Sequence, residues 1–193
     1  MTQRKKKPEP VRLNIGCGPD QPEGWVNLDS NPDEEPDIVA DVRHLPFDDD
    51  SVDEIYASHI LEHIDCREPV LEEWCRVLRP GGLITIAVPD IIATFFAVRR
   101  GGYYAGMPSE QVPCDTTWLN ATVFGGFLVY PQFNHAGHIH RQVFLFDDLE
   151  YRMMPIFEHV TRVGACSRRS ATPGEIMVQG LKPSPLNVLR SDG

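Results

Sequence analysis

The feature that most constrains the fold of this chain is a short apolar strand that runs directly into a glycine turn. Val11 to Ile15 form a β-branched and apolar run, which meets a Gly-x-Gly turn at Gly16 and Gly18. Glycine permits a sharp turn and a close approach of the backbone to a ligand, because it has no Cβ. A second short strand then ends in Asp29, with only ten residues between Gly18 and Asp29. A parallel α/β sheet usually places a whole helix there, so we expect this crossover to be a tight loop.

Strand-like and helix-like segments alternate over the first 90 residues, which is typical of a parallel sheet covered by helices. Strands are expected at residues 11–15, 25–28, 37–40, 52–57 and 83–88. A helix is expected before the last of these, because apolar residues recur on one helical face from Val70 to Leu78. Pro80 and Gly81 are expected to end that helix.

The C-terminal part predicts one more helix and two strands. "FDDLEYRMMPIF" is helix-like, and the strand-like segments "EHVTRV" and "EIMVQG" follow it. A turn rich in Ser, Arg, Gly and Pro separates these two strands, which predicts a closing antiparallel hairpin. The expected fold class is therefore α/β, a Rossmann-like, doubly wound and mostly parallel sheet with a closing antiparallel hairpin and a shortened first helix.

Length and charge limit the class of protein. The chain has 193 residues, 41% of them hydrophobic, which is enough for one compact domain that we place at residues 11–182. We expect residues 1–10, with the basic run "RKKK", to be a disordered tail and residues 183–193 to be a frayed one. A formal net charge of −10 argues against nucleic acid as a partner.

The cysteines and the hydropathy indicate a compartment. The five cysteines are scattered and include no C-x-x-C pair, so we expect reduced thiols in a cytoplasmic protein. No apolar run approaches the roughly 18 residues that a membrane span needs. No apolar stretch follows the N-terminal charges, as a signal peptide would require.

Acidic residues follow two of the expected strands. Asp29, which ends "WVNLD", could accept hydrogen bonds from both hydroxyls of a ribose, or it could be a surface acid in a turn-rich stretch. Asp41, after the next strand, could accept from an exocyclic amine. The dinucleotide fingerprint is poorly met, because Gln21 stands where a third glycine is required and Asp29 follows Gly18 too closely.

Several segments together resemble a known family. "LNIGCG", "NLD", "ADVRHLPFDDDSVDEIYASHILEHI" and "LEEWCRVLRPGGLITIAVPD" occur in this order over residues 11–90. They resemble class I S-adenosylmethionine-dependent methyltransferases, specifically the small "type 11"-like branch. The later "NHAGHIHRQVFLFDDLEYRMM" is similar to the segment before that family's last hairpin. The resemblance implies S-adenosylmethionine as the cofactor and S-adenosylhomocysteine as the product.

The resemblance also implies a set of cofactor-binding residues. They are Gly16, Cys17, Gly18, Asp29, Asp41, Val42, Ser58 and His59. The glycine turn would line the methionine and ribose, and Asp29 would take the ribose hydroxyls. Asp41 and the backbone of Val42 would hold the adenine, while Ser58 and His59 would close the site after the fourth strand.

Methyl transfer from a sulfonium depends mainly on the alignment of the reacting groups. A hydroxyl acceptor also needs a general base, which typically contributes roughly 10²–10⁴-fold. The candidates are His59, His63, Asp90, His138 and His140, and His63 could equally be a packed helix residue. Enzymes that methylate base amines usually carry an Asn/Asp-Pro-Pro-aromatic stretch after the fourth strand. The sequence "SHIL" stands there instead, which also disfavours a nucleic-acid substrate.

Residues 91–145 are too long and too aromatic for a plain connector, and we expect them to form an acceptor-side insertion or lid. His138, His140 and Arg141 would bind the acceptor, and Arg141 could clamp a carboxylate or phosphate. No metal is predicted from "NHAGHIHR", because no further ligand is evident. Its histidines could instead face solvent, and the aromatic residues could form a homodimer interface.

Three functions from different classes remain open on the sequence. The leading one is a methyltransferase that acts on a small molecule, a glycan or a lipid precursor. The second is a non-catalytic binding or assembly protein that keeps the fold, for which the shortened first helix is the best argument. A nicotinamide-dependent oxidoreductase is the third.

Overall fold

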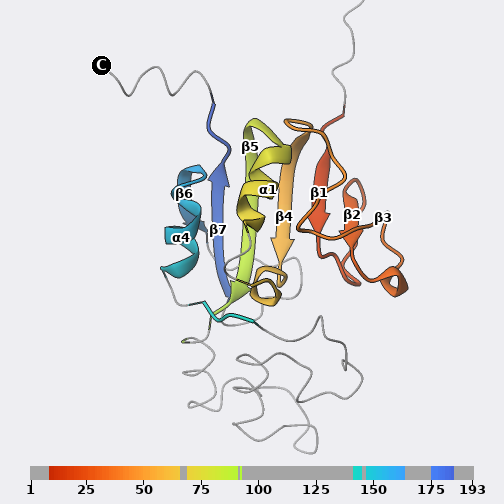
Figure 1. The fold of residues 1–193 in the computed structure, drawn as a ribbon, viewed down its shortest axis with the longest axis horizontal. Helices are drawn as coiled ribbons and strands as arrows, with labels where there is room; N and C mark the ends of the chain where they lie inside the picture. The colour runs from red at the N-terminus through yellow and green to blue at the C-terminus, as the bar shows by residue number, and fades with distance from the viewer. Residues whose placement is uncertain are drawn as a thin grey trace, which may run out of the picture.

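A seven-stranded sheet forms the framework of the protein, in the strand order β3-β2-β1-β4-β5-β7-β6 (Figure 1). The computed structural model describes residues 9–65, 69–90, 92, 141–144, 147–163 and 175–184. The parallel strands are β1 (Arg12–Ile15), β2 (Val26–Asp29), β3 (Ile38–Val39), β4 (Val52–Ser58) and β5 (Leu78–Pro89). The closing hairpin is β6 (Glu158–Val163) and β7 (Glu175–Leu181), and β7 runs antiparallel to both β5 and β6. The predicted fold class is confirmed.

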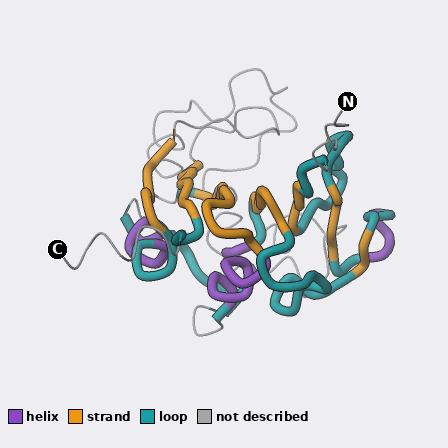
Figure 2. Tube along the Cα trace, turned by 90° about the horizontal axis from the view of Figure 1, so that it is seen from above, coloured by secondary structure: helices purple, strands orange, loops and turns teal. Residues whose placement is uncertain are grey.

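Two α-helices, α1 (Val70–Val77) and α4 (Asp148–Met153), lie on the same side of this sheet (Figure 2). Their apolar faces contribute to one core, in which Trp74 of α1 and Leu149 of α4 are fully buried. Two short 3₁₀ helices complete the described elements, η1 (Pro32–Glu34) and η2 (Leu61–His63).

The end of α1 differs from the expectation. The helix ends at Val77, and β5 begins at Leu78, so Pro80 and Gly81 lie within β5 rather than at the helix end. Leu78 pairs with Val52, but the next pair along β4 and β5 is Glu54 with Leu83, so the intervening β5 residues loop out. Gly81 has a φ of +74°, a conformation that favours glycine. The Pro-Gly-Gly signal therefore marks a turn inside a strand and not a helix stop.

The crossover from β1 to β2 contains no helix, as predicted, and polar side chains hold it instead. Asn14 of β1, which is 3% exposed, donates from Nδ2 to the carbonyl of Asp20 at 2.7 Å and to Oδ1 of Asn27 at 3.0 Å. Asn27 of β2 in turn donates from its backbone and side chain to Oδ2 of Asp37, at 2.8 and 3.1 Å. Buried polar groups require hydrogen-bond partners, and Asn14 finds its partners in the loop and on the neighbouring strand. These bonds therefore tie the loop to β1 and β2.

Trp25, directly before β2, covers part of the sheet face opposite α1 and α4. It packs against a small second cluster of Tyr56, Ala87 and Met177. The rings of Trp25 and Tyr56 meet edge to face, with centroids 6.4 Å apart and an interplanar angle of 73°. One aromatic residue thus supplies apolar cover on the side where the first helix is missing.

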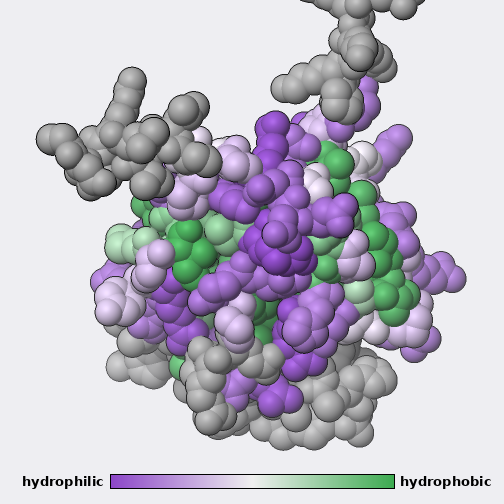
Figure 3. Space-filling model, turned by 45° about the horizontal axis from the view of Figure 1, so that its top comes forward, coloured by the Kyte–Doolittle hydropathy of each residue, from purple (hydrophilic) through white to green (hydrophobic). Residues whose placement is uncertain are grey.

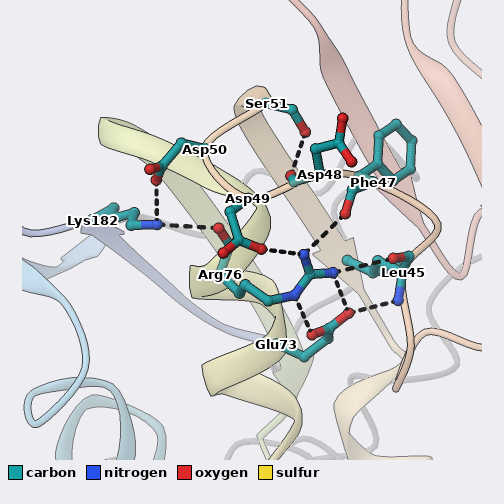
Figure 4. Close-up of polar contacts among 9 residues, drawn as sticks. All are labelled: Leu45, Phe47, Asp48, Asp49, Asp50, Ser51, Glu73, Arg76 and Lys182. Carbon is teal, nitrogen blue, oxygen red and sulfur yellow. Dashed lines mark hydrogen bonds and ion pairs between the residues drawn. The ribbon is translucent and has the colours of Figure 1, made fainter.

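An ionic network at the amino ends of β4 and β5 accounts for the "LPFDDDS" and "RVLRPGG" motifs (Figure 4). Arg76 of α1 donates to both carboxylate oxygens of Glu73 at 2.8 Å, to the carbonyl of Phe47 at 3.0 Å and to Asp49 at 2.6 Å. Lys182, which follows β7, reaches Asp50 at 2.6 Å. The face that carries this edge is largely hydrophilic (Figure 3). These motifs therefore hold a loop at the edge of the sheet opposite the glycine turn.

Several sequence-based expectations lie outside the described residues. These are most of the two tails, and most of the insertion at 91–145 with His138 and His140. Over the described ranges, no helix is both long and apolar enough to cross a membrane.

Candidate functional site

The candidate residues gather at the carboxyl edge of the parallel strands. In open α/β sheets, ligands bind outside this edge. Along it the strand order places Asp41 after β3, Asp29 at the end of β2, the glycine turn after β1, and Ser58 at the end of β4. Neighbouring strands are about 4.8 Å apart, so these four positions form one continuous row.

The glycine turn is constrained by both its backbone and a close neighbour. Gly16 and Gly18 have φ angles of +63° and +48°. A Cβ built on Gly16 would lie 2.9 Å from Cβ of Ile60, which follows β4. Gly16 is therefore required by its backbone conformation and by the close approach of Ile60. The sequence did not indicate this contact with Ile60. Cys17 between them is 1% exposed, and its N–H donates to the carbonyl of Leu28 at 3.1 Å.

Asp29 faces the glycine turn from the neighbouring strand. Its Oδ2 accepts from the N–H of Gly18 at 2.9 Å, and its Oδ1 accepts from the N–H of Asn31 at 2.9 Å. A carboxylate has about four lone-pair sites, so both oxygens retain the capacity to accept one more hydrogen bond. The structure thus brings Asp29 and Gly18 together, as a shared binding role requires.

Asp41 lies in a partly exposed ion pair with Arg43. The guanidinium donates to Oδ1 at 2.9 Å and to Oδ2 at 2.6 and 3.0 Å, and the Arg43 N–H adds a bond of 2.9 Å to Oδ1. The hydrogen bonds to Arg43 lower the pKa of Asp41, although burial opposes this shift. The adjacent Val42 is buried, and its carbonyl accepts from the indole of Trp74 at 2.9 Å. No local sequence pattern indicated that the guanidinium of Arg43 would bind this carboxylate.

The end of β4 carries two unusual residues. Ser58 is 6% exposed, and among the described residues its hydroxyl has no hydrogen-bond partner. His59 has a φ of +55°, and its N–H donates to the carbonyl of Ala87 at 2.9 Å. Left-handed backbone at a non-glycine residue is often found at functional sites.

Two buried glutamates that sequence reasoning missed flank His59. Nε2 of His59 lies 2.7 Å from Oε1 of Glu175, and Nδ1 lies 3.4 Å from Oε1 of Glu62. The side chains of both glutamates are 1% exposed, whereas that of His59 is 27% exposed. Glu175 begins β7, opposite Pro89 of β5, so the antiparallel hairpin brings it to the carboxyl edge. That hairpin was predicted, but its pairing with β5, which brings Glu175 to His59, was not.

The two carboxylates decide the charge of His59. Burial by itself would lower the pKa of the imidazole, but the hydrogen bonds and charges of Glu175 and Glu62 outweigh it and raise the pKa from 6.5 to about 9. His59 is therefore protonated at neutral pH, which suits it less to accepting a proton than to holding charge.

Three other predicted residues border this group. His63 lies in η2, with Nε2 3.9 Å from Oε1 of Glu62. Asp90 is 7% exposed at the end of β5, and its Oδ1 accepts from the N–H of Ile92 at 2.9 Å. Arg141 is exposed, and its backbone N–H donates to the carbonyl of Glu62 at 2.7 Å. The end of the 91–145 segment thus returns to the same edge of the sheet.

Comparison with known proteins agrees with this arrangement. Residues 17–86 match the family model described as a methyltransferase domain. "Methyltransferase GfsG" of Streptomyces halstedii is 33% identical over an alignment that takes in 42% of this chain and 37% of that protein. "Sterol 4-C-methyltransferase strm-1" of Caenorhabditis elegans is also 33% identical, over 37% of this chain and 24% of that protein. The chain therefore spans well under half the length of these curated relatives.

A solved structure shares the fold of the described residues. It is a SAM-dependent methyltransferase of Methanosarcina mazei, with a TM-score of 0.59 and 17% identity, covering 92% of this chain and 95% of that one. The resemblance that the sequence motifs carry is thereby confirmed over residues 17–86, which match a methyltransferase domain, and in the fold, which is shared with S-adenosylmethionine-dependent methyltransferases.

Proposed function

We propose that the chain is an enzyme that transfers a methyl group from S-adenosylmethionine to a small molecule, a glycan or a lipid precursor. One observation carries this proposal. The carboxylate of Asp29 lies against the glycine turn through the Gly18 N–H, at the edge of a methyltransferase domain where ligands of such sheets bind.

The cofactor would lie along the row of strand ends. The glycine turn would line its methionine and ribose, and the free acceptor sites of Asp29 would take the ribose hydroxyls. Asp41 and the backbone of Val42 would hold the adenine, which requires Asp41 to share its oxygens with Arg43. Ser58 would close the site, since its buried hydroxyl lacks a partner among the described residues.

The protein's part in the reaction is mainly to orient the acceptor. When bound, S-adenosylmethionine supplies the activated methyl group. Where the acceptor is a hydroxyl, Asp90 or His63 at the edge of the sheet could take its proton, while His59 already holds one at neutral pH. His138 and His140 remain candidates outside the described residues, and the insertion at 91–145 with Arg141 would bind the acceptor.

A non-catalytic binding or assembly protein is the second candidate, because residues 16–25 form no helix between β1 and β2. A shorter crossover leaves one side of the cofactor with less cover. The asparagine bonds that hold this loop show that it is an ordered alternative to the helix, which favours the catalytic candidate.

Calorimetric titration with S-adenosylmethionine, S-adenosylhomocysteine and NAD tests the proposal. We expect saturable binding of the first two and none of NAD. An absence of binding of both S-adenosyl compounds by the folded protein would support the non-catalytic candidate.

A further inference from the structure

Glu62, His59 and Glu175 form a group that is here called the histidine–glutamate cluster. The proposed function assigns no role to the two glutamates. One imidazolium lies between two carboxylates whose side chains are 1% exposed. The cluster holds two carboxyl groups and one imidazole, so its acidic groups outnumber its basic one. Asp90, 7% exposed at the neighbouring end of β5, adds a third carboxyl group to this region. Charges removed from water are weakly screened, so their field extends to ligands nearby.

The cluster occupies a defined place along the carboxyl edge. A Cβ on Gly16 would touch Ile60, the residue after His59, so the cluster borders the glycine turn. Asp29 and Asp41 lie on the other side of that turn, at β2 and β3. A cofactor whose nucleoside lies at β2 and β3 would point its reactive end toward β4, β5 and β7. The cluster would then lie on the side of the acceptor.

Two buried polar atoms also lie at this place. Oε2 of Glu175 and Oγ of Ser58 are buried and, within the described ranges, have no hydrogen-bond partner. Both residues point to the same face of the sheet, because Ser58 pairs with Ala87 and Ala87 with Met177, two residues from Glu175. Buried polar atoms without partners are few in folded proteins, and each calls for a reason.

We propose that the histidine–glutamate cluster makes this end of the site selective for positive charge, so that the attacking group of the acceptor is a neutral hydroxyl or amine and not a carboxylate or phosphate. This inference rests on the proposed function. A hydroxyl or amine forms its bond to the methyl carbon with its own lone pair, while the carbon–sulfur bond breaks and its electron pair stays on sulfur. The positive charge moves from sulfur to the acceptor and disappears when the acceptor's proton passes to Asp90 or His63 from a hydroxyl, or to water from an amine.

A fixed negative charge stabilises positive charge that develops beside it, and this costs no reorganisation at the moment of reaction. The same field repels an anionic attacking group. An anionic group elsewhere on the acceptor is left to the exposed Arg141. Glu62 and Glu175 are therefore specificity-determining residues of the acceptor site.

The inference can be tested without knowing the acceptor, by comparing two cofactor analogues. Sinefungin carries an ammonium where S-adenosylmethionine carries its methylated sulfur, and S-adenosylhomocysteine is neutral there. The variant Glu62→Gln/Glu175→Gln raises the charge of the cluster by at least one unit, whether or not His59 keeps its proton. The control Glu54→Gln/Glu150→Gln removes two carboxylates from the start of β4 and from α4. Calorimetry measures the affinity of each protein for both analogues.

We expect the cluster variant to bind sinefungin roughly tenfold more weakly. This is the effect on affinity expected of one unit charge several ångström away at an effective dielectric constant near about 20. Its affinity for S-adenosylhomocysteine and both affinities of the control should stay unchanged. An unchanged preference between the analogues overturns the inference alone. Failure of the unmodified protein to bind S-adenosylhomocysteine overturns the proposed function and the inference with it.

Should the double variant not fold, Glu175→Gln is measured at a pH at which proton NMR shows His59 still protonated. The same loss of preference for sinefungin is then expected, and an unchanged preference again overturns the inference.

Discussion

His59 is the residue whose surroundings say most about the site. It combines a left-handed backbone, a partly exposed ring and two buried carboxylate neighbours. Strain of this kind persists only where the surrounding structure holds it. Here the Ala87 carbonyl, Glu62 and Glu175 do so from three elements.

The protonation of His59 should make stability depend on pH. Its pKa is raised from 6.5 to about 9, so its contribution is complete below pH 6.5 and is lost as the pH rises through about 9. A shift of this size corresponds to about 3 kcal/mol of the free energy of unfolding. Urea denaturation at a series of pH values measures this loss, and proton NMR of the ring measures the midpoint. A midpoint near pH 6.5 would show that the two glutamates do not raise the pKa of His59.

Asp29 is expected to matter for binding more than for folding. Asp29→Ala leaves ribose hydroxyls and the Gly18 N–H without their acceptor, and a hydrogen bond to a charged group contributes about 1.5–3 kcal/mol. S-adenosylmethionine affinity should therefore fall roughly ten- to a hundred-fold in calorimetry. The exposed Asp33 offers a control, since Asp33→Ala should bind normally. Equal affinity of both variants would remove Asp29 from the site.

Gly16 should be required for folding as well as for the ligand. Its φ of +63° costs a residue with a side chain about 1–2 kcal/mol, and a Cβ would also meet Ile60. We expect Gly16→Ala to cost less stability in an Ile60→Gly background, which removes the Cβ, Cγ1 and Cδ1 atoms that the new Cβ would meet, than in the unmodified protein. If urea denaturation gives the same cost in both backgrounds, contact with Ile60 is not the cause.

At the scale of elements, the sequence predicted the strands better than it predicted the contacts that their residues make. All seven strands and the hairpin follow from local hydropathy and turn residues, and Asp29 and Asp41 follow from the strand ends. The partners of these residues depend on contacts far apart in the chain. Glu175 meets His59 only through the pairing of β7 with β5. Pro80 lies in a turn within β5 because the register between β4 and β5 shifts there. Local patterns carry no information about such contacts.

The motifs around Arg76 should serve stability and not binding. Arg76→Lys keeps the charge but loses the planar fork that reaches Glu73, Asp49 and the carbonyls of Leu45 and Phe47. We expect a loss of about 1–3 kcal/mol in urea denaturation, with unchanged affinity for S-adenosylhomocysteine. The control Arg79→Lys alters an ion pair that is about half exposed on the arginine side, and should cost little. Weaker cofactor binding in Arg76→Lys would contradict this separation of roles.

At the scale of the whole molecule, the two edges of the sheet have different roles. The amino edge carries the Arg76 network, which holds the loop before β4. The carboxyl edge carries the glycine turn, Asp29 and the histidine–glutamate cluster. Most parallel α/β sheets have this division, and here it persists although the first helix is replaced by a loop tied to Asn14 and Asn27.

The central claim is that S-adenosylmethionine binds along the carboxyl edge. Two-dimensional amide NMR of the labelled protein, titrated with S-adenosylhomocysteine, tests it most directly. We predict saturable shifts at Gly18, Asp29, Val42 and Ser58, with little change at Asp49, Asp50 and Lys182 on the opposite edge. Shifts confined to the opposite edge, or no shifts at millimolar ligand while the spectrum remains that of a folded protein, would contradict the account.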